Sequence, residues 1–329
     1  MAAGAAGLFL DPFGPPLPPL PEPNAYPELV EAGAAIRHRK SDDPNDPDTL
    51  LAWFESRRDI EGRARRALEH ESGVPLLGDV DAIVNRSVQA IGPLRDLGRY
   101  FLTKAKLARE EGRTDDALAA ILDALGLSGK AGRGGLIIDQ EVGIAIESTA
   151  MEALGELAEA LDDAQSARAM KAIQALEERR EGPDTVCRRE RALYRSRGEL
   201  PIRLMARMTP GRFNMMCKPA EDAFRRFHDR SSARARLLLL ELALRRYRRG
   251  QGAEAARLED LVPEYLPTVP ADPFGKGPPV YRQVGGGHML YSVGPDGTDD
   301  GGEPVPIKGM TAGSRRDIPV PGLGPRPGP

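Results

Sequence analysis

The chain has 329 residues, and its 46 basic and 49 acidic side chains give a net charge of −3. This length predicts about two domains, and a hydrophobic content of 40% can supply their cores. The charge excludes an overall bias toward nucleic acid. Two cysteines, Cys187 and Cys217, exclude a disulfide-dense scaffold and a cysteine-rich zinc site. They would form one bridge in an exported protein, but nothing in their spacing requires it, and free thiols are preferred.

Residues 1–23 combine an apolar start, MAAGAAGLFL, with a proline-rich stretch that ends at Pro23. The apolar start is shorter than the ~20 residues that span a bilayer, and no basic region precedes it as in a signal peptide. Two interpretations stay open. The segment is either a disordered start, or the remnant of a membrane anchor that begins upstream of Met1, with the prolines as a stiff stalk.

Between residues 24 and 215 the apolar residues recur at helical spacing, so we expect an irregular α-helical domain. The side chain of Asn24 can cap the first helix, with Pro27 tolerated in its first turn. A second helix is expected over residues 49–71, where Trp53 lies off the apolar stripe and is expected to anchor a neighbouring element.

Residues 93–111 and 115–127 are expected to form two helices that pair about Gly112. The apolar residues that would face one another are Leu97, Tyr100, Phe101, Ala105, Leu107, Leu118, Ile121 and Leu125. This pair resembles a single tetratricopeptide-type unit, but no second copy follows at a spacing of about 34 residues, so a solenoid is not supported. Helices over 135–161 and 164–181 continue the array.

Residues 218–303 predict a small α+β module. An apolar stripe at helical spacing is followed by arginines and by Gly250 and Gly252, which can end the helix. The stripe consists of Leu237, Leu240, Leu244 and Tyr247. Residues 280–284 and 289–293 have strand composition, and glycines 285–287 predict a hairpin between them. Because a lone hairpin is marginal in water, the leucine stripe is expected to cover it.

This module resembles the globular end of the major pseudopilin of type II secretion systems. The resemblance is carried by Tyr247, Leu258, Leu261-Val262-Pro263, Asp272-Pro273-Phe274-Gly275, Tyr281-Arg282 and Leu290-Tyr291-Ser292-Val293-Gly294-Pro295-Asp296-Gly297. It covers about the last fifth of the chain. That family has a basic leader and an apolar membrane helix with an early glutamate, whereas the motif here follows more than two hundred unrelated residues and no such helix. The resemblance therefore implies a pseudopilin-like module rather than a filament subunit.

Three aspartates, Asp296, Asp299 and Asp300, lie among glycines and are the candidate metal ligands. Carboxylates on such a loop can supply the oxygen shell that Ca²⁺ prefers, although the spacing is not that of an EF-hand. The pseudopilin resemblance implies that the corresponding loop binds calcium, and it points to Asp296 as a ligand more directly than to Asp299 or Asp300. The alternative is an acidic surface turn. The remaining residues, 304–329, show almost no apolar periodicity and are expected to be disordered.

Residues 186–250 carry 18 basic and 6 acidic side chains, which gives this segment a charge of +12. The arginines are spread over helical faces, and no aromatic residues alternate with them as in a base-stacking platform, so nucleic acid is disfavoured. We expect a solvated face that is partly paired with the acidic remainder of the chain. Contact with an anionic membrane surface or a protein partner is the alternative.

No motif in the sequence predicts catalysis. The four histidines lack metal-binding or catalytic spacing and are expected at the surface or at helix caps: His38, His70, His228 and His288. The glycines around Lys130 lack the spacing of a phosphate-binding loop. We therefore expect no enzyme. The alternative is a hydrolase with a dispersed site, which a pocket holding His228 or Cys187 beside a carboxylate would support.

The expected fold is mainly α, an irregular helical array followed by an α+β module in which a long helix packs on a short antiparallel hairpin. The expected function is that of a non-catalytic, envelope-facing protein that binds protein partners in secretion or surface assembly. The expected location is the cell envelope, with membrane anchoring if the start lies upstream, and the cytoplasm as the alternative. A binder of anionic lipid or nucleic acid through residues 186–250 is a further alternative.

Overall fold

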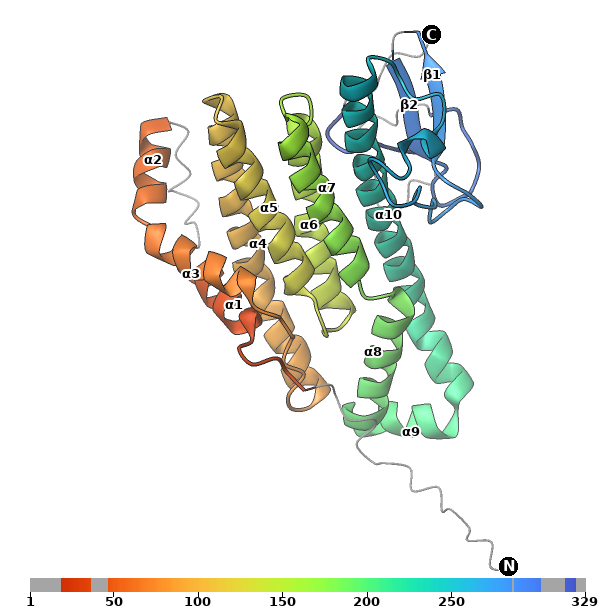
Figure 1. Ribbon diagram of the computed structural model, residues 1–329. Coiled ribbons are helices and arrows are strands. Elements are labelled where there is room, and N and C mark those ends of the chain that lie inside the picture. The colour runs from red at the N-terminus through yellow and green to blue at the C-terminus, as the bar shows by residue number, and fades with distance from the viewer. Residues whose placement is uncertain (1–18, 37–46, 286, 303–316, 324–329) are drawn as a thin grey trace, which may run out of the picture.

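The computed structural model describes residues 19–36, 47–285, 287–302 and 317–323, so the apolar start at 1–10 lies outside the described residues. Within these ranges the protein is mainly helical, with a small antiparallel sheet at the C-terminal end, as expected (Figure 1). The elements are α1 (Ala25–Ile36), α2 (Pro47–Glu55), α3 (Arg58–Glu69), α4 (Val80–Glu110), α5 (Thr114–Ala131), α6 (Ile137–Leu157), α7 (Asp163–Arg179), α8 (Pro183–Arg197), α9 (Leu200–Met208), α10 (Pro210–Gln251), the 3-10 helix η1 (Leu258–Leu261), β1 (Val280–Val284), β2 (Gly287–Ser292) and β3 (Ile318–Pro319).

Asn24 caps α1, as the sequence predicted. Its side-chain oxygen accepts hydrogen bonds from the backbone amides of Tyr26 (3.1 Å) and Gly73 (3.0 Å), which also fixes the loop before α4. On the next turns, a Cβ at Gly33 would lie 2.0 Å from the carbonyl oxygen of Pro93. Glycine is therefore needed for α1 to lie this close to α4.

The single helix expected over 49–71 is divided into α2 and α3. The hydroxyl of Ser56 donates to the carbonyl of Trp53 (2.8 Å), and the guanidinium of Arg57 donates to the same oxygen (3.4 Å). The last carbonyls of a helix have no partner within the helix, and these two bonds supply one for Trp53. They therefore favour the end of α2 at this point and a new helix, α3, after it. Trp53 is 8% exposed and its ring centroid lies 5.2 Å from that of Tyr100 on α4, so it anchors a neighbouring helix as expected.

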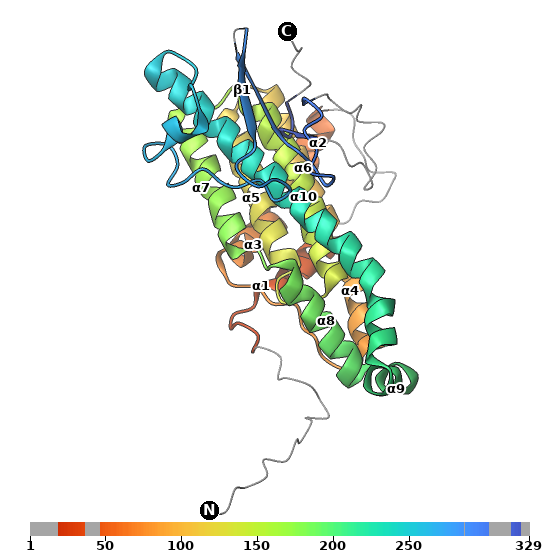
Figure 2. The same ribbon diagram turned by 90° about the vertical axis from the view of Figure 1, so that its right-hand side faces the viewer.

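Helices α4 to α7 form the centre of the array. The helix pair expected about Gly112 is present as α4 and α5, although α4 begins at Val80 rather than at residue 93 and continues through Pro93. All eight apolar residues assigned to its interface are buried. The next helices extend the array, with α6 against α4 and α5, and α7 against α5. Figure 2 shows these helices packed face to face behind α10.

The longest helix, α10, belongs to both parts of the molecule. Its first turns contact α8 and α9, and its last turns contact α6, α7, β2 and β3. The boundary expected between residues 215 and 218 therefore falls inside one continuous helix. Leucines 237–240, 242 and 244 are all buried in the same apolar cluster as the helical array and the sheet. The array and the C-terminal lobe (residues 252–302 and 317–323) thus share one core.

The hairpin forms where expected, with Tyr281 of β1 opposite Leu290 of β2 in antiparallel register. A third strand, β3, pairs with β2 and places Pro319 opposite Tyr291. The expectation of a disordered tail after residue 303 is therefore wrong for residues 317–323.

The segment that follows β3 is held against α6 by two glycines. A Cβ on Gly155 would lie 1.9 Å from the carbonyl oxygen of Pro321. Gly322 adopts φ +67°, a left-handed conformation that favours glycine. This close backbone contact has no apolar periodicity, so the pattern of the sequence could not reveal it.

Candidate functional site

Two of the stretches that carry the pseudopilin resemblance, residues 272–275 and 290–297, meet at one buried carboxylate, that of Asp272, which is 4% exposed. It accepts hydrogen bonds from the backbone amides of Phe274 and Val293 (both 3.0 Å) and from the hydroxyl of Ser292 (2.8 Å). The amide of Asp272 donates to the carbonyl of Gly277 (2.7 Å). One side chain thus closes the proline-rich turn and ties it to the end of β2.

The hairpin packs on α10 as the leucine stripe predicted. Leu290 of β2 and Ile318 of β3 are buried in the cluster that contains Leu240 and Leu244. The hydroxyl of Tyr281 donates to the carbonyl of Ala255 (2.6 Å), which fixes β1 to the segment after α10. Helix, turn and sheet therefore form one unit.

The candidate calcium loop is held largely by bonds within the lobe. Asp299 accepts hydrogen bonds from the hydroxyl of Tyr291 (2.7 Å) and the guanidinium of Arg282 (2.6 Å). These partners, with the Tyr291 hydroxyl first, hold the pKa of Asp299 below its usual range. Asp296 is exposed and accepts from the backbone amide of Thr298 (3.1 Å). Asp300 is also exposed. The three side chains lie on one loop but, in the ranges that the structure describes, do not form a cluster that could hold a metal ion.

A fourth carboxylate, which the sequence analysis missed, lies behind this loop. Asp317 is 2% exposed, and its Oδ2 accepts from the amide of Gly302 (2.8 Å). Its Oδ1 is buried without a hydrogen-bond partner among the described residues. Burial raises the pKa of Asp317, and nearby Asp300 and Asp299 raise it further. The backbone amides of Gly302 and Asp300 lower it again, and a cation beside Asp317 would offset the remaining repulsion.

In the described part of the chain, no three His, Cys, Asp or Glu side chains are already arranged to hold a metal ion. Calcium therefore stays a prediction.

If calcium binds, adding Ca²⁺ will raise the melting temperature of the wild type, because the ion offsets the repulsion at Asp317. The shift will be lost in Asp317→Ala and reduced in Asp296→Ala, and kept in Asp59→Ala, which removes an exposed aspartate of α3. Identical melting with and without Ca²⁺ in all four proteins would exclude the site.

His288 is buried, not at the surface as expected. It is 3% exposed, and its Nε2 lies 2.8 Å from Oε2 of Glu241 while its Nδ1 lies 3.1 Å from Oε2 of Glu254. Glu241 also accepts from Arg245 (2.7 Å), and a cavity of about 300 Å³ adjoins the group. The partners lie 34 and 47 residues from His288, so no local motif could predict them. The group joins β2 to α10.

The two residues named for a hydrolase, Cys187 and His228, are both buried, so His228 is not at the surface as expected. Cys187 is buried among Ile144, Val186 and Phe224, and burial raises the pKa of its thiol. His228 lies 3.2 Å from both Asp229 Oδ1 and the carbonyl of Glu181. Neither residue lines the cavity beside His288 or a second cavity of about 250 Å³ between α5, α6 and α7. The expectation of no catalysis stays a prediction.

The other cysteine and histidine expectations have simpler outcomes. Cys187 and Cys217 are free thiols, as preferred from the sequence. His70 is exposed and caps the C-terminal end of α3. His38 lies outside the described residues.

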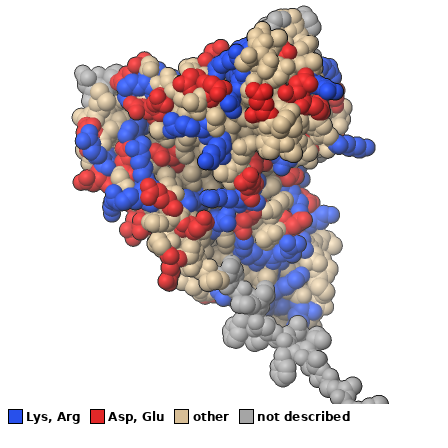
Figure 3. All heavy atoms as spheres, in the orientation of Figure 1, with Lys and Arg blue, Asp and Glu red and all other residues tan. Residues whose placement is uncertain are grey.

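Much of the basic segment is paired with acidic side chains of the same chain. The ion pairs made by its arginines are Arg189–Glu181, Arg191–Glu221, Arg225–Asp184, Arg234–Glu152, Arg236–Glu177, Arg245–Glu159, Arg245–Glu241, Arg246–Asp163 and Arg248–Glu254. Several of these pairs join α10 to α6 and α7. The segment is therefore partly self-paired, as expected. Toward the lower right of Figure 3, over α8 and α9, basic side chains remain with few acidic neighbours.

Comparisons with known proteins add no family to these observations. No family model matches the chain, and neither a curated protein nor a solved structure matches it. None of the described helices is both long and apolar enough to cross a bilayer.

Proposed function

We propose that this protein is a non-catalytic component of the cell envelope, in which a pseudopilin-like C-terminal lobe docks to partners of a secretion or surface-assembly system. The observation that carries the proposal is the buried contact of Asp272 with Ser292 and Val293. It joins two of the stretches of sequence on which the resemblance depends. Motifs that were recognised separately along the chain thus serve one structural purpose, which supports a shared module rather than chance matches.

The role proposed for the module is docking rather than polymerisation. A filament subunit needs a free apolar helix, whereas the first half of α10 is rich in arginine and packs against α8 and α9. The second half is buried by α6, α7 and the sheet. With the apolar second half of α10 covered in this way, the outer surface of the lobe is available to a partner.

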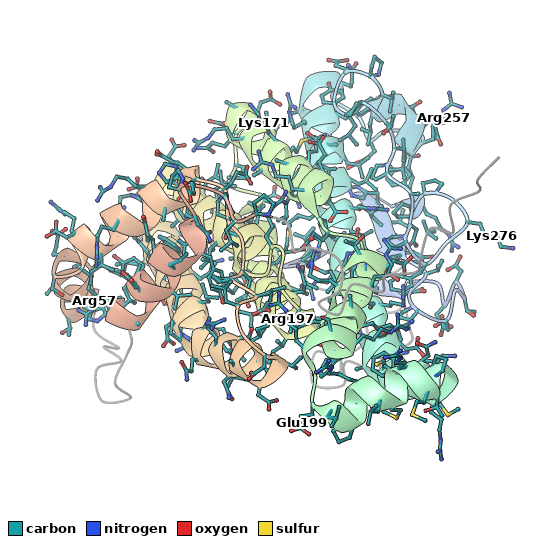
Figure 4. All side chains as sticks on the ribbon, turned by 90° about the horizontal axis from the view of Figure 1, so that it is seen from below. Arg57, Lys171, Arg197, Glu199, Arg257 and Lys276 are labelled. Carbon is teal, nitrogen blue, oxygen red and sulfur yellow. The ribbon has the colours of Figure 1, made fainter. Side chains whose placement is uncertain are left out.

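Two lobe positions suit a direct test by site-specific photo-crosslinking in the native host. Arg257 and Lys276 are exposed and extend from the lobe, whereas Lys171 is exposed on α7 (Figure 4). A photo-reactive residue at Arg257 or Lys276 is expected to crosslink to a secretion or surface-assembly component in the envelope fraction. The same residue at Lys171 serves as the control. A purely cytosolic distribution, or equal crosslinking from all three positions, would contradict the proposal.

A further inference from the structure

The end of the molecule farthest from the sheet is formed by α9 and the first turns of α10. We call residues 199–219 the tip. Helix α9 has nine residues and none of them is buried. Figures 1 and 4 show it projecting at the margin of the molecule, with Glu199 at its start. A helix with so little burial must contribute little to the stability of the fold, so its composition needs another explanation.

The tip concentrates exposed apolar side chains. Ten large hydrophobic residues are exposed in the described protein, and half of them lie in these 21 residues. They are Leu200 (63% exposed), Leu204 (46%), Met208 (76%), Met215 (72%) and Met216 (50%). Single exposed apolar residues are ordinary, but a cluster of this kind marks an interaction site.

Cations occupy the same surface. Arg203 and Arg207 lie beside Leu200 and Leu204 on the exposed face of α9, because these positions fall within a narrow arc of a 3.6-residue helix. Arg212 and Lys218 continue the charge onto α10, and Glu199 is the one acidic residue of the tip. None of these four cations forms an ion pair within the described structure, whereas six arginines farther along α10 do: Arg225, Arg234, Arg236, Arg245, Arg246 and Arg248.

We propose that the tip docks on an anionic lipid bilayer, with its leucines and methionines in the headgroup region and its cations on the lipid phosphates. A short amphipathic helix with leucine among arginines is suited to this interface. A second copy of the chain fits less well, because two such faces would bring Arg203 and Arg207 against like charges. Nucleic acid also fits less well, because the aromatic residue of the tip, Phe213, is buried.

The first described residues of the chain lie at the same end of the molecule as the tip. A Cβ at Gly73 would lie 3.1 Å from the side chains of Leu20 and Pro21, which are near the start of the described chain. Arg197 at the end of α8 donates to the carbonyl of Leu76 (2.8 Å) in the same loop as Gly73. Pro19 therefore lies toward the end of the molecule that carries the tip. The inference goes beyond the function proposed for the lobe, which lies at the opposite end, and each can fail without the other.

The test is flotation of the purified full chain with vesicles of phosphatidylcholine, with or without about 30% phosphatidylglycerol. The wild type is expected to float with the anionic vesicles only, and to be released by high salt. Replacing Arg203 and Arg207 with glutamine should weaken binding about thirtyfold. Leu204→Ser with Met208→Ser should weaken it by about tenfold or more.

Matched control variants replace side chains of the same types, arginine and leucine, outside the tip. Arg63→Gln with Arg66→Gln changes two exposed arginines of α3 that form no ion pair in the described structure, and Leu51→Ser changes an exposed leucine of α2. These variants should bind as the wild type does, and all proteins should melt alike because the tip residues changed are not buried. Equal binding to both vesicle types, equal loss in tip and control variants, or a dimer that Leu204→Ser dissolves would overturn the inference.

Discussion

Replacing Arg180 with methionine is expected to lower the free energy of unfolding by about 3–5 kcal/mol. Arg180 lies just after α7, and its side chain is 11% exposed. Its guanidinium donates to Glu147 on α6 and to Glu177 on α7, both at 2.7 Å. Methionine has a similar length but no charge, so two buried carboxylates would lose the cation that compensates them.

The network extends to α10, which explains why the effect should be global. The hydroxyls of Ser231 and Ser232 donate to Glu147 (2.6 Å) and Glu177 (2.5 Å), and Arg236 donates to Glu177 (3.1 Å). Three helices therefore meet at these side chains. Denaturant unfolding of the full chain measures the loss, and Arg179→Met is the control, since the neighbouring Arg179 is exposed.

The same variant should change the dependence of stability on pH. Burial alone would raise the pKa of Glu177, but Arg180, Ser232 and Arg236 lower it below the ordinary glutamate value. A lowered pKa contributes stability above the unfolded pKa, and this contribution is lost as pH falls through the folded pKa. In Arg180→Met the carboxylate of Glu177 loses its main cation and its protonation becomes favourable, so the deficit of the variant against the wild type should shrink between neutral pH and about pH 4. A constant deficit would show that charge is not the cause.

Replacing Asp272 with alanine is expected to cost about 3 kcal/mol and to loosen the C-terminal lobe before the array. Three donors would lose a charged acceptor, and the hydroxyl of Ser292, a residue with no exposed surface, would be left without that bond. Hydrogen exchange at the amide of Val293 should accelerate, because that amide now donates to Asp272. Amides of α5, remote from the lobe, should keep their protection.

Asp260→Ala is the matched control for this experiment. Asp260 also accepts hydrogen bonds, from the amide and the guanidinium of Arg257 (both 3.1 Å), but it lies near the surface. Exposed pairs of this kind contribute little, so its loss should cost far less stability than the loss of Asp272. If the two variants lost equal stability, Asp272 would not be the residue that organises the lobe.

Local patterns predicted the helices well, because capping by Asn24 and apolar periodicity act within a few residues. The leucine stripe also predicted the packing of α10 on the hairpin, since an uncovered hairpin is unstable. The break at Ser56 was missed, because it depends on side-chain bonds to a carbonyl that periodicity does not report. Strand β3 was missed because its prolines resemble those of a disordered tail.

The candidate sites show the same division. The sequence identified the stretches around Asp272 and Ser292, but only the fold shows that they touch. It identified the aspartates at 296–300, but not Asp317, which reaches the loop through β3. The burial of His288 depends on Glu241, 47 residues away. Such groups assemble through tertiary structure, so spacing along the chain carries no signal for them.

Helix α10 has a mechanical consequence. Its 42 residues span about 60 Å at the rise of an α-helix, and it contacts α9 at one end and the sheet at the other. No loop separates those ends, and Pro219 near the α9 end is the one position inside α10 that lacks a backbone donor, so a load applied to one end is delivered to the other through continuous helix. A protein standing on its α9 end would therefore keep its sheet at a fixed height and angle above whatever supports it.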